Sequence, residues 1–155
     1  MTFQIHPMPE GDFQKYFAMD RDTLKAHNAQ IHEVTSKPGA PCRVSLVDAE
    51  IGARVVLVNH EHQPENSPYR SSHAIYVQEG AVETKPNAGH VPDVLTCRTL
   101  SVRGFDADHC IQDADIVDGA DLAKRLDQIF EDDRIRYAHV HFAGRGCFAA
   151  KVTRA

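Results

Sequence analysis

The chain has 155 residues and a formal net charge of −5, with a sequence pI near 6.0. Its 42% hydrophobic and 25% charged residues predict one folded domain over residues 1–155 rather than a disordered chain. The longest strongly apolar stretch, residues 55–58, is too short to cross a bilayer, and no basic run offers the surface that nonspecific nucleic-acid binding needs. These features exclude membrane and nucleic-acid partners and favour a small molecule or another protein.

The start of the chain lacks the basic residues and apolar stretch of a secretory signal, so we expect a cytoplasmic protein with reduced cysteines. Its four cysteines are far apart in the sequence and form no Cys-x-x-Cys pair: Cys42, Cys97, Cys110 and Cys147. This spacing argues against a zinc ribbon or a thioredoxin-type site.

The sequence of the first half of the chain predicts several short strands and two short helices. Its predicted elements are, in order, a strand at 2–6, a helix carrying Phe13, Tyr16 and Phe17, a helix capped by Asp20 that ends near His27, and strands at 30–35, 42–46, 54–59 and 73–78. The strand at 54–59 is apolar on both faces, which is typical of the middle of a sheet.

In the second half of the chain, the sequence pattern predicts two hairpins with a helix between them. Strands at 95–105 and 110–117 are expected to pair across residues 106–109, and strands at 137–142 and 147–152 form the last hairpin. Between them, Asp118 is placed to cap a helix whose apolar stripe is Leu122, Leu126, Ile129 and Phe130. Together these elements predict a single-domain α+β fold, with an antiparallel or mixed sheet and helices packed on one face.

Two histidine pairs stand out among the ten histidines of the chain. His60 and His62 flank Glu61, and His139 and His141 flank Val140. Because side chains alternate along a strand, each spacing places both rings on one side.

The register of the last hairpin decides what lies beside its histidines. If Phe148 shares the apolar face with Ala150 and Val152, His141 lies opposite Cys147, and residues 142–146 form the connection. A register shifted by one residue would place His141 beside Phe148 and mix the two faces.

The histidines allow three interpretations. His60, His62, His139 and His141 could bind a divalent transition metal, which neutral imidazoles suit, with Cys147 or Glu61 as a further ligand. His139 and His141 could instead transfer protons in catalysis, assisted by Tyr69, Tyr137 or Cys147. The third interpretation is structural, with each ring hydrogen-bonded within its own strand.

A second polar cluster covers residues 67–73. Tyr69, Arg70 and Ser71 lie in this constrained loop, where a guanidinium, hydroxyls and backbone N–H groups suit a carboxylate or phosphate ligand, and Arg43 is expected to join them. The alternative is that Arg70 pairs with Asp48 or Glu50 and that the serines satisfy the turn backbone.

Three groups of motifs occur in a fixed order along nearly the whole chain. They are 41–46 with Asp48-Ala49, Ser67-Pro68-Tyr69-Arg70, and His139-Val140-His141 with Gly146-Cys147-Phe148. In these motifs the sequence resembles an uncharacterised bacterial family known as domain of unknown function 1203. The resemblance implies a single bacterial domain and carries no established activity.

The leading hypothesis is therefore a protein that binds a small anionic molecule in a polar pocket of histidine, arginine and cysteine side chains, and that acts on this molecule if it is an enzyme. The alternatives are a metal-binding protein or metalloenzyme that uses the paired histidines, and a non-catalytic protein-interaction module.

Overall fold

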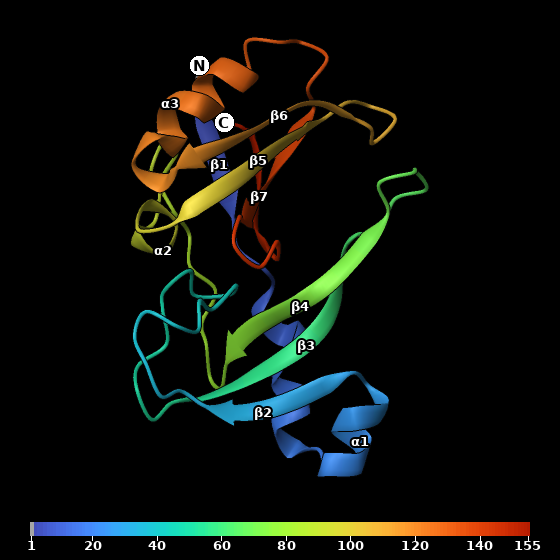
Figure 1. The fold of residues 1–155 in the computed structure, drawn as a ribbon, viewed down its shortest axis with the longest axis vertical. Helices are drawn as coiled ribbons and strands as arrows, with labels where there is room; N and C mark the ends of the chain where they lie inside the picture. Colours follow the sequence, from blue (N-terminus) through green and yellow to red (C-terminus); the bar gives the residue numbers. More distant parts are fainter. Residues whose placement is uncertain (1) are drawn as a thin grey trace.

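The computed structural model describes residues 2–155 as two antiparallel sheets with a few short helices, which confirms the predicted α+β fold (Figure 1). The five-stranded sheet has the order β1-β8-β7-β5-β6, and the three-stranded sheet has the order β2-β3-β4. The strands are β1 (Phe3–His6), β2 (Ala29–Glu33), β3 (Arg54–Gln63), β4 (Ser71–Gln78), β5 (Thr99–Phe105), β6 (Ile111–Asp118), β7 (Tyr137–Phe142) and β8 (Phe148–Arg154). The helices are α1 (Arg21–Ala26), α2 (Asp93–Thr96) and α3 (Leu122–Ile129), with 3-10 helices at Glu10–Asp12, Gln14–Ala18 and Gly119–Asp121.

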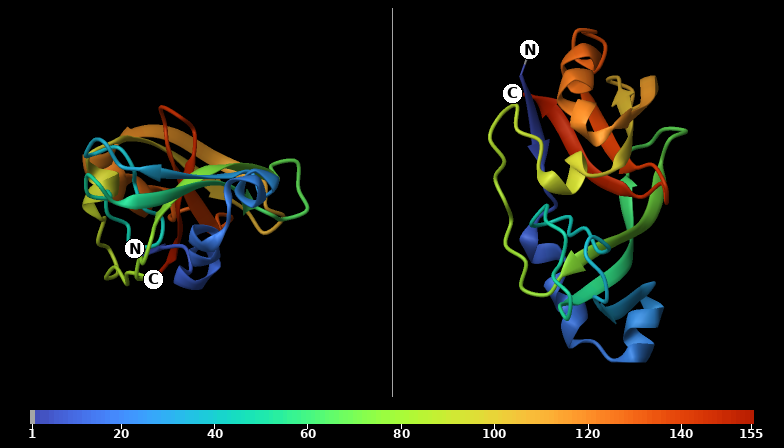
Figure 2. Two further views of the ribbon diagram at one scale, coloured as in Figure 1. Left: turned by 90° about the horizontal axis from the view of Figure 1, so that it is seen from below. Right: turned by 60° about the vertical axis from the view of Figure 1, so that its left-hand side comes forward.

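One face of the five-stranded sheet is covered by α3. Leu122, Leu126 and Ile129 of this helix are fully buried in the core between helix and sheet. Burial of side chains of this size contributes about 1.5–3 kcal/mol each. The expected cap is present, since the Asp118 side chain accepts a hydrogen bond from the Ala120 N–H at 3.0 Å. β1 pairs with β8, so the two ends of the chain lie close together (Figure 2).

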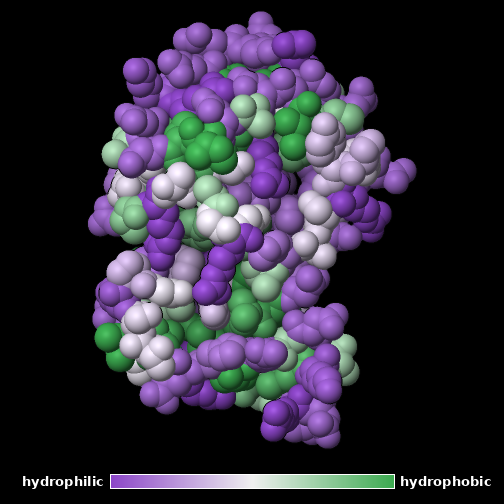
Figure 3. Space-filling view, in the orientation of Figure 1, coloured by the Kyte–Doolittle hydropathy of each residue, from purple (hydrophilic) through white to green (hydrophobic). Residues whose placement is uncertain are grey.

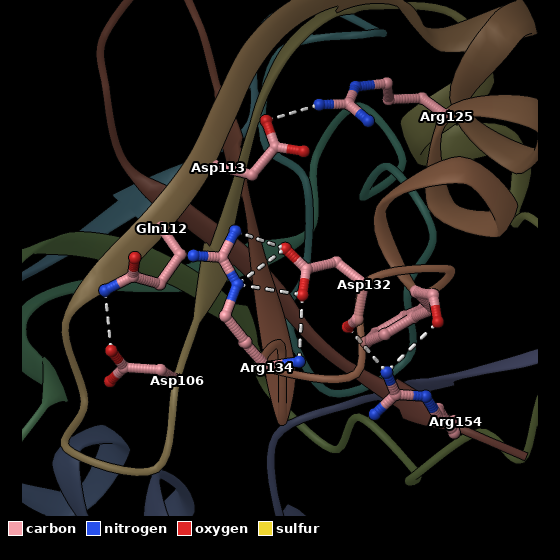
Figure 4. A network of polar contacts seen from close by, with 8 residues as sticks. Asp106, Gln112, Asp113, Arg125, Asp132, Arg134 and Arg154 are labelled. Carbon is pink, nitrogen blue, oxygen red and sulfur yellow. Dashed lines mark hydrogen bonds and ion pairs between the residues drawn. The ribbon is translucent and has the colours of Figure 1, made fainter.

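Charged side chains around α3 are paired with one another (Figure 4). Arg125 of α3 contacts Asp113 of β6 at 2.6 Å. Arg154 donates to the carbonyl oxygens of Phe130, Asp132 and Ile135, which ties the end of β8 to the segment after α3. The covered face is therefore closed by apolar packing and by paired charges.

The three-stranded sheet has a core of its own. Val56 and Val58 of β3 are buried, and they pack with Ile75 of β4 and with Phe13 from the N-terminal segment. β3 is longer than predicted because it continues through His60 and His62 to Gln63, rather than ending at residue 59. The two histidines therefore lie within a paired strand.

Three predicted elements were wrong in detail. Residues 42–46 are not a strand but a tight turn, closed by the Leu46 N–H and the Cys42 carbonyl at 3.0 Å. The segment around Phe13 forms two 3-10 helices in place of one helix. Residues 95–98 belong to α2 and its C-terminal turn, because the Leu95 N–H bonds the Pro92 carbonyl and starts a helical turn there.

The predicted register of the last hairpin was also wrong. His141 pairs with Phe148, and His139 pairs with Lys151. A bulge at Ala149 accounts for the difference, because one extra residue in β8 moves Phe148 to the histidine face while Ala150 and Val152 stay on the apolar face. Residues 143–147 connect the two strands, and Gly146 among them has a φ of +79°.

Candidate functional site

The site lies where the end of β3 meets the face of the five-stranded sheet opposite α3. His62 of β3 meets His139 and His141 of β7 there. The ring centroid of His62 lies 4.9 Å from that of His141 and 6.1 Å from that of His139, and the two β7 rings are 6.1 Å apart. Hydrophilic residues lie along the level where the two sheets meet (Figure 3).

Aromatic packing and a bulge hold the three rings together. His62 stacks on Phe148 at 5.5 Å with an interplanar angle of 7°. The pairing of β3 with β4 shifts between His60 and Gln63, and the buried Gln63 amide donates to the Tyr137 hydroxyl at 2.9 Å. His60 does not join the cluster but packs against Phe13, at a ring distance of 5.9 Å. Three of the four predicted metal ligands are thus brought together.

The three rings make few hydrogen bonds. His141 Nδ1 lies 2.9 Å from the Gly146 carbonyl oxygen, and His62 Nε2 lies 3.0 Å from the Ser71 hydroxyl. His62 Nδ1, His139 Nδ1 and His141 Nε2 are buried and have no hydrogen-bond partner among residues 2–155. Buried polar atoms are nearly always bonded, so three unpartnered nitrogens in one cluster are unusual and make this cluster the candidate site.

Burial keeps these imidazoles neutral. Desolvation, followed by the positive charge of neighbouring groups, lowers the pKa of His139 and that of His141 to about 3. The same causes lower the pKa of His62 to about 4. All three rings are therefore uncharged at neutral pH, in the state that can accept protons or hydrogen bonds.

A row of charged groups crosses the sheet at His139. Arg103 of β5 is the cross-strand neighbour of His139 on one side, and Lys151 of β8 is its neighbour on the other. Neither cation makes an ion pair within the described residues 2–155. Arg103 is partly buried, burial lowers its pKa, and its Nε donates to the Ser101 hydroxyl at 3.3 Å. We call Arg103, His139 and Lys151 the cationic row.

The sequence analysis did not identify Arg103 or Lys151 as site residues. Each is one charged residue in an alternating strand, and alternation predicts only that it lies on the polar face. Their position beside His139 depends on which strands pair and in what register. The sequences of β5 and β8 do not by themselves indicate which strands pair or in what register.

Hydrogen bonds hold Tyr137, at the start of β7, in place beside the site. The Tyr137 hydroxyl, which accepts from Gln63, lies 2.8 Å from Nδ1 of His109, and Nε2 of His109 lies 3.6 Å from a Glu65 carboxylate oxygen. These contacts join the loop after β3 to the turn between β5 and β6. They fix the Tyr137 ring, which stacks on Phe105 at 5.1 Å.

The predicted anion-binding loop contributes one group to the cluster. Ser71 contacts His62, whereas Arg70 forms an exposed ion pair with Glu61 at 3.1 Å. Tyr69 is 41% exposed and lies beside Phe105, at a ring distance of 6.3 Å. Arg70 therefore has an acidic partner, though neither of the two expected for it.

Arg43 and Cys147 lie together on the other side of the final hairpin. Both are buried, and Cys147 belongs to the apolar core behind the histidine face. Arg43 donates to the carbonyl oxygens of Phe148 at 2.8 Å and Pro41 at 2.6 Å, and its guanidinium lies over the Phe142 ring at 4.9 Å. These contacts join the 41–46 segment to the hairpin, away from the three imidazoles.

Two further observations limit the chemistry. Between Thr2 and Ala155, no group of three or more His, Cys, Asp or Glu side chains is arranged to hold a metal ion. Two open cavities, of about 1220 Å³ beside α1 and β2 and about 610 Å³ beside residues 45–48, are lined by other residues than the three imidazoles.

None of the helices in the described part of the chain is long and apolar enough to span a membrane.

Comparison with protein families matches residues 39–154 to DUF1203, described as a protein of unknown function. The chain belongs to the DUF1203 family. This confirms the resemblance seen in the sequence motifs, and the matched range contains the whole histidine cluster and the cationic row. No curated protein and no solved structure matches this DUF1203 chain.

Proposed function

We propose that the protein binds a small anionic molecule at the cationic row, with His62, His139 and His141 lining the site. The observation that supports this most directly is the pair of cations flanking His139, Arg103 and Lys151, neither of which has an acidic partner in residues 2–155. Cross-strand neighbours lie within about 5.5 Å of each other at Cβ, so one carboxylate or phosphate can contact more than one of them.

We expect a ligand to reach the site from the side of β6. Ser101 is the cross-strand neighbour of Ile116, whose side chain is 61% exposed on the same face. His139 and His141, by contrast, are only 3% and 1% exposed. A ligand therefore approaches over β5 and β6, meets Arg103 first, and contacts the imidazoles at the inner end of the site.

Anion binding at this place changes the protonation of the imidazoles. An anion beside a neutral ring favours its charged form, so the pKa of His139 rises when the ligand binds. The groups that face this ring from the adjoining elements are Arg103, Lys151, His62 and His141, and all of them disfavour its protonation without a ligand. Because the pKa of this ring is about 3 in the free protein, binding takes up protons near neutral pH only when the anion raises it by about three units. A ring that gains a proton in this way can also serve acid–base catalysis, which is the enzymatic form of the proposal.

The test compares two arginines. Thermal shift and calorimetry with inorganic phosphate and small carboxylates should show binding to the wild type, a loss of at least about tenfold in affinity in Arg103→Gln, and no change in Arg70→Gln. Arg70 is the matched control because its guanidinium is exposed and already paired with Glu61. Equal effects of the two substitutions, or no binding by the wild type, would overturn the proposal.

Metal binding is a second candidate that the unpartnered ring nitrogens favour. It requires the rings of His62, His139 and His141 to turn, since the described side chains do not form a ready metal site. Elemental analysis of untagged protein and titration with Co²⁺ test it directly, because tetrahedral nitrogen ligands give Co²⁺ intense visible bands. Less than about a tenth of an equivalent of bound metal, with no such bands, would remove this candidate.

A further inference from the structure

The hydrogen bond to Gly146 fixes which nitrogen of His141 carries the proton. A backbone carbonyl oxygen can only accept, so the neutral ring must donate from Nδ1 across the 2.9 Å contact. Nε2 of the same ring then holds a bare lone pair. This nitrogen is buried and has no hydrogen-bond partner in the described part of the chain.

A two-step chain fixes His62 in the same way. The Ser71 hydroxyl lies 3.0 Å from the Tyr69 carbonyl oxygen, to which it must donate its single proton. Its oxygen therefore accepts from Nε2–H of His62 across 3.0 Å. Nδ1 of His62, also buried and unpartnered, is left with a lone pair.

We propose that these two buried nitrogens, His62 Nδ1 and His141 Nε2, accept hydrogen bonds from the ligand, and that the ligand is a small hydroxy acid or a comparable hydroxyl-bearing anion. This inference rests on the proposed function, because the cationic row supplies the contact to the acid group. The two rings lie 4.9 Å apart, and both belong to the cluster that adjoins Arg103. A ligand with an acid group alone would satisfy the cation and leave both lone pairs unpaired.

The same reasoning separates this site from a simple anion pocket. An oxyanion cannot donate a hydrogen bond, so it gains nothing from a neutral imidazole lone pair. A hydroxyl next to the acid group can donate to one ring, and a buried donor–acceptor pair is favoured over an unpaired acceptor. The structure thus assigns selectivity for hydroxyl-bearing anions to the histidines and affinity for the acid group to the arginine.

The experiment uses probe pairs that differ by one hydroxyl: glycolate against acetate, and lactate against propionate. Calorimetry on the intact chain should show about tenfold tighter binding of each hydroxy acid. Ser71→Ala removes the acceptor that fixes the His62 ring, so the preference should fall to about threefold or less. Ser72→Ala is the matched control, since the neighbouring serine is exposed and lies on the other side of β4.

The outcomes are distinguishable. Equal affinity for both members of each pair, with binding still dependent on Arg103, would overturn the hydroxyl inference and leave the proposed function standing. No binding of any probe would overturn both. An undiminished preference in Ser71→Ala would show that the His62 tautomer does not set it.

A second measurement does not require a ligand. Two-bond ¹H–¹⁵N correlation spectra of the histidine rings report directly which nitrogen is protonated. We expect the Nδ1–H form for His141 and the Nε2–H form for His62 at neutral pH. The opposite tautomer at either ring would contradict the inference.

Discussion

The two faces of the five-stranded sheet differ in how their polar groups are satisfied. On the face covered by α3, Arg125 contacts Asp113, and Arg154 donates to three backbone carbonyls. On the opposite face, Arg103 and Lys151 have no acidic partner in the described chain, and three imidazole nitrogens are unpartnered. The same strands therefore present a face whose arginines are paired within the chain and a face whose cations have no acidic partner among residues 2–155.

The largest expected effect is on the covered face. Leu126→Ala removes a fully buried side chain between α3 and the sheet, and it should lower the free energy of unfolding by about 2–5 kcal/mol. Chemical denaturation measures this change. Leu126 and the cationic row lie on opposite faces of the sheet, so the affinity of the folded protein for phosphate should stay unchanged. A loss of phosphate affinity in Leu126→Ala would show that the two faces are not independent.

The second effect is a pH dependence of the free energy of unfolding. It comes from the histidines on the face opposite α3, which we call the open face. His139 and His141 have a pKa of about 3 in the folded protein, against an ordinary value of 6.5 for a histidine side chain. Between these values the unfolded chain binds more protons, so stability falls as the pH is lowered from 6.5 toward 4. Each ring contributes on the order of 1.4 kcal/mol per pH unit.

Denaturation curves at several pH values check this slope. The double variant His139→Gln/His141→Gln should show a flatter dependence between pH 6.5 and 4 than the wild type. Identical slopes would mean that carboxylates elsewhere account for the loss of stability.

A smaller effect on stability is expected for the cations of the open face. Arg103→Gln/Lys151→Gln removes two like charges beside His139, and the free energy of unfolding should change by less than about 1 kcal/mol. Phosphate binding should nevertheless be lost. If the double variant unfolds as readily as Leu126→Ala, these cations stabilise the fold and are not available to a ligand.

The smallest effect is expected for the exposed ion pair of Arg70 with Glu61. Arg70→Gln should change the free energy of unfolding by less than about 0.5 kcal/mol, since both side chains are about half exposed. Its phosphate affinity should equal that of the wild type. A weaker affinity would return Arg70 to the anion-binding role that the sequence suggested.

Local patterns predicted much of the fold. The helix stripe at Leu122 and Leu126 and the caps Asp20 and Asp118 depend on residues close together in the sequence, and the structure has them. The hairpin of β5 and β6 is likewise present. Such features follow from propensity and periodicity over a few residues.

The site could be predicted only in part, because it depends on register and strand pairing. Alternation placed His139 and His141 on one face, but the bulge at Ala149 brought Phe148 beside them. Arg103 becomes part of the site only because β5 pairs with β7. Cys147 follows the His139/His141 pair closely in the sequence, yet it lies in the apolar core behind the histidine face, where the distant Arg43 contacts it.

The most direct test of the account is an NMR titration of the arginine and histidine side chains with inorganic phosphate at neutral pH. The signals of Arg103 Nε and of the His139 ring should move with a common saturation curve, while those of Arg125 and Arg154 on the covered face should stay in place. Unmoved Arg103 and His139 signals at high phosphate, or equal movement on both faces, would contradict the claim that the open face is an anion-binding site.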